Sequence, residues 1–163
     1  MIIIITGTPG TGKTSLAKAL AKRLKIKYLD VNKVIAKYKL REAYERKRQT
    51  YIVDEKKLSK ILKKIIKENK DLIIDSHLSH FIPKKHVDIC IVTKTDLKVL
   101  KKRLEKRKYS KAKVKENVDA EIFEICHTEA QDMGHNIILV DTTKQSLEKC
   151  IKLLENEINE NKR

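Results

Sequence analysis

The chain has 163 residues, a length typical of one domain that can bury its own core. Lys and Arg outnumber Asp and Glu by 38 to 22, which gives a formal net charge of +16. This charge favours polyanionic partners such as nucleotides or RNA, although lysine-rich faces also serve simply to keep a protein soluble. The three cysteines are scattered and form no Cys-x-x-Cys pair, which argues against a disulfide framework and a zinc site. No segment is long and apolar enough to cross a bilayer, so we expect a soluble, cytoplasmic protein.

Short apolar runs alternate along the chain with helical patterns, which is typical of βαβ units. We expect strands at about residues 2–6, 28–31, 72–75, 87–92 and 136–140. We expect helices that start near Lys13, Asp54, Asp96, Val114 and Leu147. In the fourth helix, the spacing of Val118, Ile122 and Ile125 predicts that all three side chains point inward. The alternation predicts an α/β fold in one domain, with a parallel sheet and helices on both of its faces.

The glycines of the chain concentrate in one short loop. Of four glycines, Gly7, Gly10 and Gly12 lie within six residues, between the first expected strand and the first expected helix. The segment fits the pattern Gly-x-x-x-x-Gly-Lys-[Ser/Thr], in which glycines let successive backbone N–H groups turn toward phosphate oxygens. The N-terminus of the following helix adds the positive end of its dipole. The sequence therefore predicts a phosphate-binding loop (P-loop).

The residues that follow the last of these glycines carry the side chains that a P-loop needs. We expect Lys13 to reach the β- and γ-phosphates of ATP, and the Thr14 hydroxyl to bind Mg²⁺. Ser15 can contact the α-phosphate. A chance turn before a helix is the alternative, but the strand and helix on either side favour ATP with Mg²⁺ as the ligand.

A second candidate element follows the strand expected at residues 72–75. A parallel sheet places Asp75, at the carboxyl end of that strand, beside the P-loop, where it would hold Mg²⁺ directly or through water. An ordinary strand-end aspartate in a turn is the alternative. His77 follows two residues later and either orients water or a hydroxyl near the γ-phosphate, or is a loop histidine with no task. Nothing in the spacing of His80 and His86 singles them out.

Two segments are rich in Lys and Arg. In the first, residues 98–115, the apolar helical pattern breaks near Tyr109, which predicts a mobile cap between two helices. Arg103 and Arg107 lie one turn apart and could close together over the transferring phosphoryl group, although a solvated basic helix would show the same pattern. The second, residues 33–48, lies where small kinases insert a clamp for the acceptor nucleotide, or forms a surface that faces RNA.

With these elements in place, the sequence resembles the adenylate kinase isoenzyme 6 family. These proteins are small nucleoside monophosphate kinases and ATPases that also act in assembly of the small ribosomal subunit. The resemblance covers nearly the whole chain. It rests on Thr6-Gly7-Thr8-Pro9-Gly10-Thr11-Gly12-Lys13-Thr14, on Asp75-Ser76-His77 with Phe81 and Pro83, and on Thr95-Asp96, Arg103-Leu104-Glu105-x-Arg107-x-Tyr109, Asn117 and Glu121-Ile122-Phe123.

The resemblance implies a P-loop fold with a five-stranded parallel sheet, an acceptor-binding insertion at residues 30–53 and a lid at residues 106–116. It implies that ATP contacts Gly10, Gly12, Lys13, Thr14, Ser15 and, from the lid, Arg107. It makes Asp75 the magnesium-associated acid and His77 the histidine linked to hydrolysis. It also places residues 142–144, with Lys144, beside the adenine ring.

The chain departs from the family pattern on the acceptor side. Ala36 and Lys37 stand where an arginine or an acid is expected, and His80 replaces an acid. The main hypothesis is an adenylate kinase that converts ATP and AMP to two ADP, with associated ATPase activity, as a monomer or weak dimer. The alternative is an ATPase assembly factor that binds a small-subunit ribosomal protein or rRNA. A kinase for another small metabolite is a third possibility.

Overall fold

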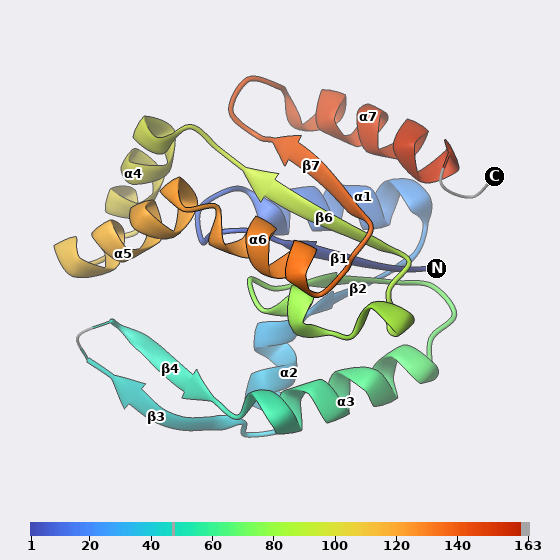
Figure 1. Cartoon of the computed structure of the whole chain (residues 1–163), viewed down its shortest axis with the longest axis horizontal. Helices are drawn as coiled ribbons and strands as arrows, with labels where there is room; N and C mark the ends of the chain where they lie inside the picture. The colour runs from blue at the N-terminus through green and yellow to red at the C-terminus, as the bar shows by residue number, and fades with distance from the viewer. Residues whose placement is uncertain (47, 161–163) are drawn as a thin grey trace.

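The computed structural model of the chain describes residues 1–46 and 48–160. Its centre is a five-stranded sheet in the order β2-β5-β1-β6-β7, in which every neighbouring pair is parallel (Figure 1). The strands are β1 (Ile2–Thr6), β2 (Lys27–Asp30), β5 (Leu72–Asp75), β6 (Ile89–Lys94) and β7 (Ile137–Asp141). The fold class and the parallel sheet expected from the sequence are confirmed.

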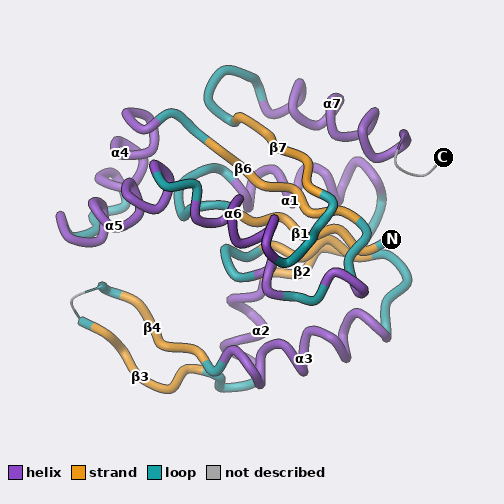
Figure 2. Tube along the Cα trace, in the orientation of Figure 1, coloured by secondary structure: helices purple, strands orange, loops and turns teal. Residues whose placement is uncertain are grey.

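Helices cover both faces of this sheet (Figures 1 and 2). They are α1 (Lys13–Leu24), α2 (Val31–Lys37), α3 (Glu55–Lys67), α4 (Leu97–Lys106), α5 (Lys111–Ile122), α6 (Ile125–Asp132) and α7 (Leu147–Glu160), with short 3₁₀ turns at Ser79–Phe81 and Lys84–His86. One core lies between the sheet and helices α2, α3 and α6, and the other lies between the sheet and helices α1 and α7. No helix within residues 1–46 and 48–160 is both long and apolar enough to cross a membrane.

The β1 strand shows why the sequence pattern identified the sheet so clearly. All five of its residues are buried, because neighbouring strands and helices enclose it on every side. Such a strand reads as a continuous β-branched run, and alternate side chains enter the two cores. The register pairs Ile5 with Asp75, so the P-loop and the candidate metal-binding acid leave the same edge of the sheet on adjacent strands.

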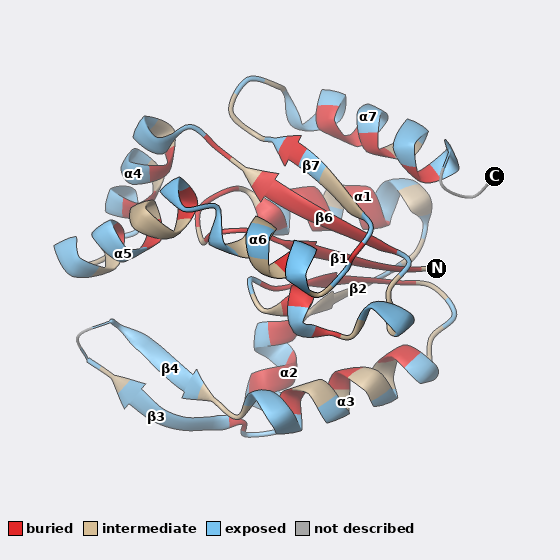
Figure 3. Cartoon of the chain, viewed as in Figure 1, coloured by how far each residue is buried: buried red, intermediate tan, exposed pale blue. Residues whose placement is uncertain are grey.

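The insertion at residues 30–53 contains a feature that the sequence analysis did not predict. After α2, strands β3 (Arg41–Glu45) and β4 (Thr50–Val53) form an antiparallel hairpin that is separate from the main sheet (Figure 1). The hairpin is almost entirely exposed (Figure 3). Because neither face is buried, its sequence lacks the clear alternation of apolar and polar residues that identifies a strand.

One expectation about the lid region is wrong. The sequence predicted Ile122 and Ile125 to point inward on one helix, but they are 50% and 40% exposed. The helix ends at Ile122, and Glu124 takes a left-handed conformation (φ 51°) before α6 begins. On α5 the buried side chains are instead Val114, Asn117 and Glu121. Val114 packs in an apolar cluster with Leu100 and Leu104 of α4, Asn117 lines a cleft, and Glu121 accepts a hydrogen bond from Thr95 N at 3.0 Å.

Candidate functional site

The P-loop occupies residues 7–14 and runs from the end of β1 into the first turn of α1. Gly7, Gly10 and Gly12 have φ angles of 136°, 99° and 90°, which side chains with a Cβ atom rarely tolerate. The sharp turns wrap the loop around the Lys13 side chain, whose Nζ donates a hydrogen bond to the Thr8 carbonyl at 3.0 Å. The glycines identified in the sequence therefore meet a real conformational requirement.

Buried threonines hold the loop against the sheet. The Thr11 hydroxyl donates to the Thr8 carbonyl at 2.7 Å and lies 2.6 Å from the Thr93 hydroxyl, which donates to the Thr6 carbonyl at 3.2 Å. These residues are at most 2% exposed. The network fixes the loop before any ligand arrives, which lowers the ordering cost of binding a polyphosphate.

Replacing Gly7 with alanine is expected to destabilise the protein by about 3 kcal/mol or more. The added Cβ would stand 2.4 Å from Thr93 Oγ1 and 2.5 Å from the Thr93 carbonyl oxygen. Gly134→Ala is the matched control, since it also has a positive φ (72°) but its Cβ meets nothing closer than 3.8 Å. Urea unfolding measures both variants. Equal losses of stability in the two variants would contradict the assignment of steric crowding at Gly7.

Lys13 carries the charge at the centre of the loop. The residue is only 9% exposed. Burial lowers the pKa of its ammonium group to about 8, and the nearby Asp75 carboxylate opposes this shift. An ammonium group that burial has already stripped of water is well placed to bind phosphate oxygens strongly.

Asp75 ends β5 beside the loop and is 4% exposed. Its Oδ2 accepts a hydrogen bond from the Tyr28 hydroxyl at 3.0 Å. Burial, followed by the charge of Asp75, raises the pKa of Tyr28, so the phenol stays protonated and keeps donating. Tyr28 orients the carboxylate. Sequence analysis did not find this contact, because 47 residues separate Tyr28 from Asp75 along the chain.

Asp75 and Thr14 together fit a magnesium ion. Both line the same cleft, and both offer the oxygen donors that Mg²⁺ prefers. Among the described residues there is no cluster of three or more His, Cys, Asp or Glu side chains that could hold a metal.

His77 lines the same cleft, and its side chain is exposed there. The surrounding protein, followed by the positive charge of Lys13, lowers the pKa of His77 to about 4. The imidazole is therefore neutral at neutral pH, with one nitrogen that donates and one that accepts a hydrogen bond.

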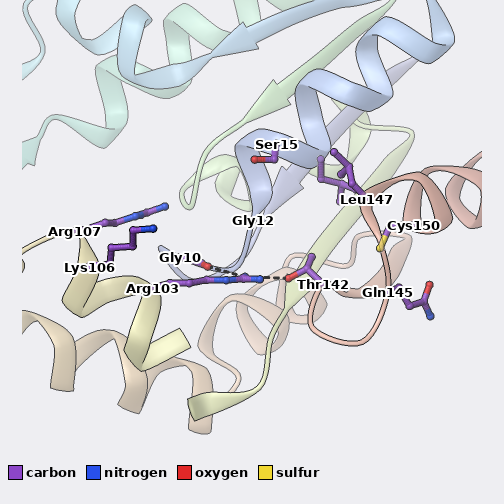
Figure 4. A pocket seen from close by; sticks show the side chains of 11 residues that line it. Gly10, Gly12, Ser15, Arg103, Lys106, Arg107, Thr142, Gln145, Leu147 and Cys150 are labelled. Carbon is purple, nitrogen blue, oxygen red and sulfur yellow. Dashed lines mark hydrogen bonds between the residues drawn. The ribbon is translucent and has the colours of Figure 1, made fainter. Parts of the chain in front are cut away.

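The P-loop separates two hollows. The first, which we call the turn-side cavity, has a volume of about 650 Å³ and lies between the loop, α4 and the turn after β7 (Figure 4). It is lined by Gly10, Gly12, Ser15, Leu16, Arg103, Lys106, Arg107, Thr142, Gln145, Leu147 and Cys150. The second, the central cleft, has a volume of about 780 Å³. Its lining includes Lys13, Thr14, Asn32, Arg48, Thr50, Asp75, His77, Arg107, Tyr109, Lys113 and Glu129.

The two predicted arginines lie in different places. Arg103 lines only the turn-side cavity, where its Nη1 donates to the Gly10 carbonyl at 3.2 Å and lies 3.5 Å from the Thr142 hydroxyl (Figure 4). Arg107 lines both hollows. Lys144 is exposed and is not part of either wall, whereas Thr142 and Gln145 from the same turn line the turn-side cavity.

The hairpin contacts the start of helix α5 beside the central cleft. The side-chain oxygen of Gln49 accepts a hydrogen bond from Ser110 N at 2.9 Å, and the backbone carbonyl of Gln49 accepts one from Lys113 Nζ at 2.6 Å. Arg48 Nε lies 3.4 Å from Glu116 Oε1. These contacts bring the two basic segments of the sequence together around one space.

Comparisons with known proteins place the chain in a family. Residues 3–124 match the family model described as AAA domain. A protein of Methanocaldococcus jannaschii named "Putative adenylate kinase" is 38% identical over 151 residues, which cover 93% of this chain and 82% of that protein. The "Adenylate kinase isoenzyme 6 homolog" of Dictyostelium discoideum is 34% identical over 159 residues, which cover 98% and 87%. The chain belongs to the adenylate kinase isoenzyme 6 family.

Solved structures agree with this family at the level of the fold. A shikimate kinase from Acinetobacter baumannii in complex with shikimate has a TM-score of 0.72 at 15% identity, covering 99% of this chain and 94% of its own. A deoxyadenosine kinase from M. mycoides has a TM-score of 0.61 at 18% identity, covering 98% and 100%. The family is one of nucleoside monophosphate kinases, so the protein is a phosphotransferase with ATP as phosphate donor.

Proposed function

We propose that the protein transfers the γ-phosphoryl group of ATP to AMP and so produces two molecules of ADP. The observation that carries this proposal is the pair of hollows on the two sides of one P-loop. They share Gly10, Gly12, Ser15 and Arg107, so a molecule in each would meet at the loop. The turn-side cavity would take the adenosine of ATP, and the central cleft would take AMP.

On the donor side, the backbone N–H groups of the loop and Lys13 would hold the phosphates, and Ser15 would contact the α-phosphate. Arg103 would border the adenosine and support the loop through the Gly10 carbonyl. Thr14 and Asp75 would hold Mg²⁺, which neutralises charge on the phosphates when bound. Lys13 and Arg107 would face the charge that develops on the moving phosphoryl group.

On the acceptor side, the insertion supplies polar groups. Asn32, Arg48 and Thr50 line the central cleft opposite the loop. Arg48 thus offers a cation for the AMP phosphate, although the family pattern places one nearer Ala36 and Lys37. The acceptor is an ionised phosphate, so no general base is required, and positioning with charge stabilisation accounts for catalysis. When AMP is absent, the neutral His77 would orient water instead and produce ATPase activity.

An assay of ADP formation with ATP in the presence and absence of AMP tests this proposal. We expect two ADP for each AMP consumed, at a rate well above basal hydrolysis. Arg48→Ala is expected to raise the KM for AMP about tenfold or more, in line with loss of a charged hydrogen bond. Arg46→Ala is the matched control, because Arg46 is exposed and does not line the cleft. If AMP does not increase ADP formation above basal hydrolysis, the proposal is overturned.

One observation favours a second candidate, an ATP-dependent assembly factor for the small ribosomal subunit that binds rRNA. On the exposed hairpin, the Arg41 guanidinium lies 4.3 Å from the centre of the Tyr51 ring, which lies 4.9 Å from the Tyr44 ring. Exposed aromatic rings beside arginine bind single-stranded RNA by stacking and charge. Fluorescence polarisation with single-stranded rRNA segments tests this. If the double variant Tyr44→Ala/Tyr51→Ala binds RNA with the same affinity as the unchanged chain, the hairpin is not the RNA-binding surface.

A further inference from the structure

His80, which stands where the family pattern has an acid, is the most deeply buried histidine among the described residues. It is 1% exposed and lies in the 3₁₀ turn Ser79–Phe81, five residues after Asp75. Both ring nitrogens are bonded. Nε2 lies 2.9 Å from Glu129 Oε2, and Nδ1 lies 2.7 Å from the Thr6 hydroxyl. No step of the proposed reaction uses this group.

Chemistry fixes the direction of these hydrogen bonds. An ionised carboxylate only accepts, so Nε2–H must donate to Glu129. In a neutral ring Nδ1 is then an acceptor, and the Thr6 hydroxyl donates to it. The same hydroxyl lies 3.4 Å from the His77 carbonyl, too far for a strong second bond. The distances thus match a neutral His80.

This chain of bonds joins three parts of the site. Thr6 is the last residue of β1 and directly precedes the P-loop. Glu129 comes from α6 and lines the central cleft. The neighbouring Ser79 hydroxyl donates toward the Ile5 carbonyl at 3.1 Å and toward the Ser76 carbonyl at 2.8 Å. With the contact between His80 and Thr6, the turn is therefore attached to β1 at two points. His77 lies within this attached segment.

We propose that His80 and Glu129 are positioning residues: the bonds from Glu129 through His80 to the Thr6 hydroxyl hold the start of the P-loop, and the turn next to His77, in their reactive arrangement. The proposal rests on the proposed kinase and ATPase function. Neither residue touches the reacting atoms. Their effect comes from geometry, because a displacement of about 1 Å in a phosphoryl-transfer site is enough to slow the reaction up to about 10²-fold.

Protonation of His80 would reverse the bonds. Nδ1–H would then donate to Thr6, and the Thr6 hydroxyl would turn to the His77 carbonyl. Burial lowers the pKa of His80 below its ordinary value, Glu129 opposes this shift, and the electrostatic interaction with His135 adds to it. The other titratable groups nearby are Cys126 of α6, which approaches Thr6, and His77 in the same loop. The neutral arrangement therefore persists at neutral pH and is lost only under acid.

Two substitutions of His80 each remove one of its two side-chain hydrogen bonds and keep the other. In His80→Asn the amide replaces the Nδ1 side of the ring and keeps the contact with Thr6, whereas in His80→Gln it replaces the Nε2 side and keeps Glu129. We expect both to lower kcat about tenfold and to leave the KM for ATP within twofold. Adding Glu129→Gln to His80→Asn is expected to change nothing further, because the bond is already broken. Asp132→Asn, an exposed carboxylate on the same helix, is the control.

Nitrogen-15 NMR of the imidazole rings and a pH profile of kcat complete the test. We expect the Nε2–H form for His80 in the unchanged chain, and an acid step in kcat at the pH where this ring titrates. Both His80 variants should lack that step. An Nδ1–H ring, or an acid step that survives in both variants, would overturn the proposal. Basal ATP hydrolysis is measured in parallel. If the unchanged chain hydrolyses ATP but shows no AMP-dependent activity, the assignment of AMP as acceptor is refuted, and the role of His80 and Glu129 is then tested on the hydrolysis rate.

Discussion

Replacing Lys13 with methionine is expected to lower the rate of phosphoryl transfer by about 10³-fold. Methionine keeps much of the apolar stem but removes the ammonium group, which is buried inside the loop and within the electrostatic influence of Asp75. In a site with little water, loss of one charge that faces the moving phosphoryl group removes on the order of 4 kcal/mol of transition-state stabilisation. Steady-state ADP formation at saturating ATP measures the change.

Two measurements keep this prediction specific. Lys22→Met removes a lysine that is exposed on the same helix and is expected to leave the rate unchanged. The affinity for an ATP analogue, measured by calorimetry, should fall in the Lys13 variant because the phosphates lose a ligand. If the Lys13 variant binds the analogue as tightly as the unchanged chain, the P-loop is not the nucleotide site.

The second large effect is expected for Asp75→Asn, which should slow ADP formation by about 10²-fold or more. The amide has nearly the same shape and can still accept the Tyr28 hydrogen bond, so the fold should persist. What is lost is the negative charge at the carboxyl end of β5, which the proposed Mg²⁺ site requires. A titration of activity against Mg²⁺ measures the effect, and we expect half-saturation to move to higher concentration.

Tyr28 provides a graded version of this experiment. Tyr28→Phe keeps the carboxylate but removes its donor at 3.0 Å, and we expect a loss of about tenfold, in line with a hydrogen bond to a charged group. Tyr38→Phe changes an exposed ring and serves as the control. If Asp75→Asn responds to Mg²⁺ as the unchanged chain does, Asp75 has no part in metal binding.

The sequence predicted the parts of the site that depend on local geometry. A glycine loop between a buried strand and a helix has one strong interpretation, and the structure gives each of its three glycines a positive φ. The sequence also located two helix starts near Asp54 and Asp96, where each aspartate accepts hydrogen bonds from backbone N–H groups of the following turn. Both signals lie within a few residues of each other and need no distant partner.

The features that sequence analysis missed or predicted wrongly depend on tertiary contacts and not on local sequence. The inward direction predicted for Ile122 and Ile125 assumed one continuous helix with its apolar side chains facing the interior. Instead α5 ends at Ile122 and buries two polar residues, Asn117 and Glu121. The hairpin had no detectable signal, because neither of its faces is buried. The partners of Tyr28, His80 and Arg103 lie 47, 49 and 93 residues away along the chain.

The sequence by itself therefore determined the α/β class and the P-loop, and it placed an acid at the end of the strand beside that loop. These depend on backbone conformation and strand order, which short residue patterns encode. Only the tertiary structure decided which cations face which hollow, which side chains α5 buries, and that His80 joins Glu129 to the end of β1. Those features arise when distant segments pack together, and a single sequence carries no record of contacts between residues that are neighbours only in space.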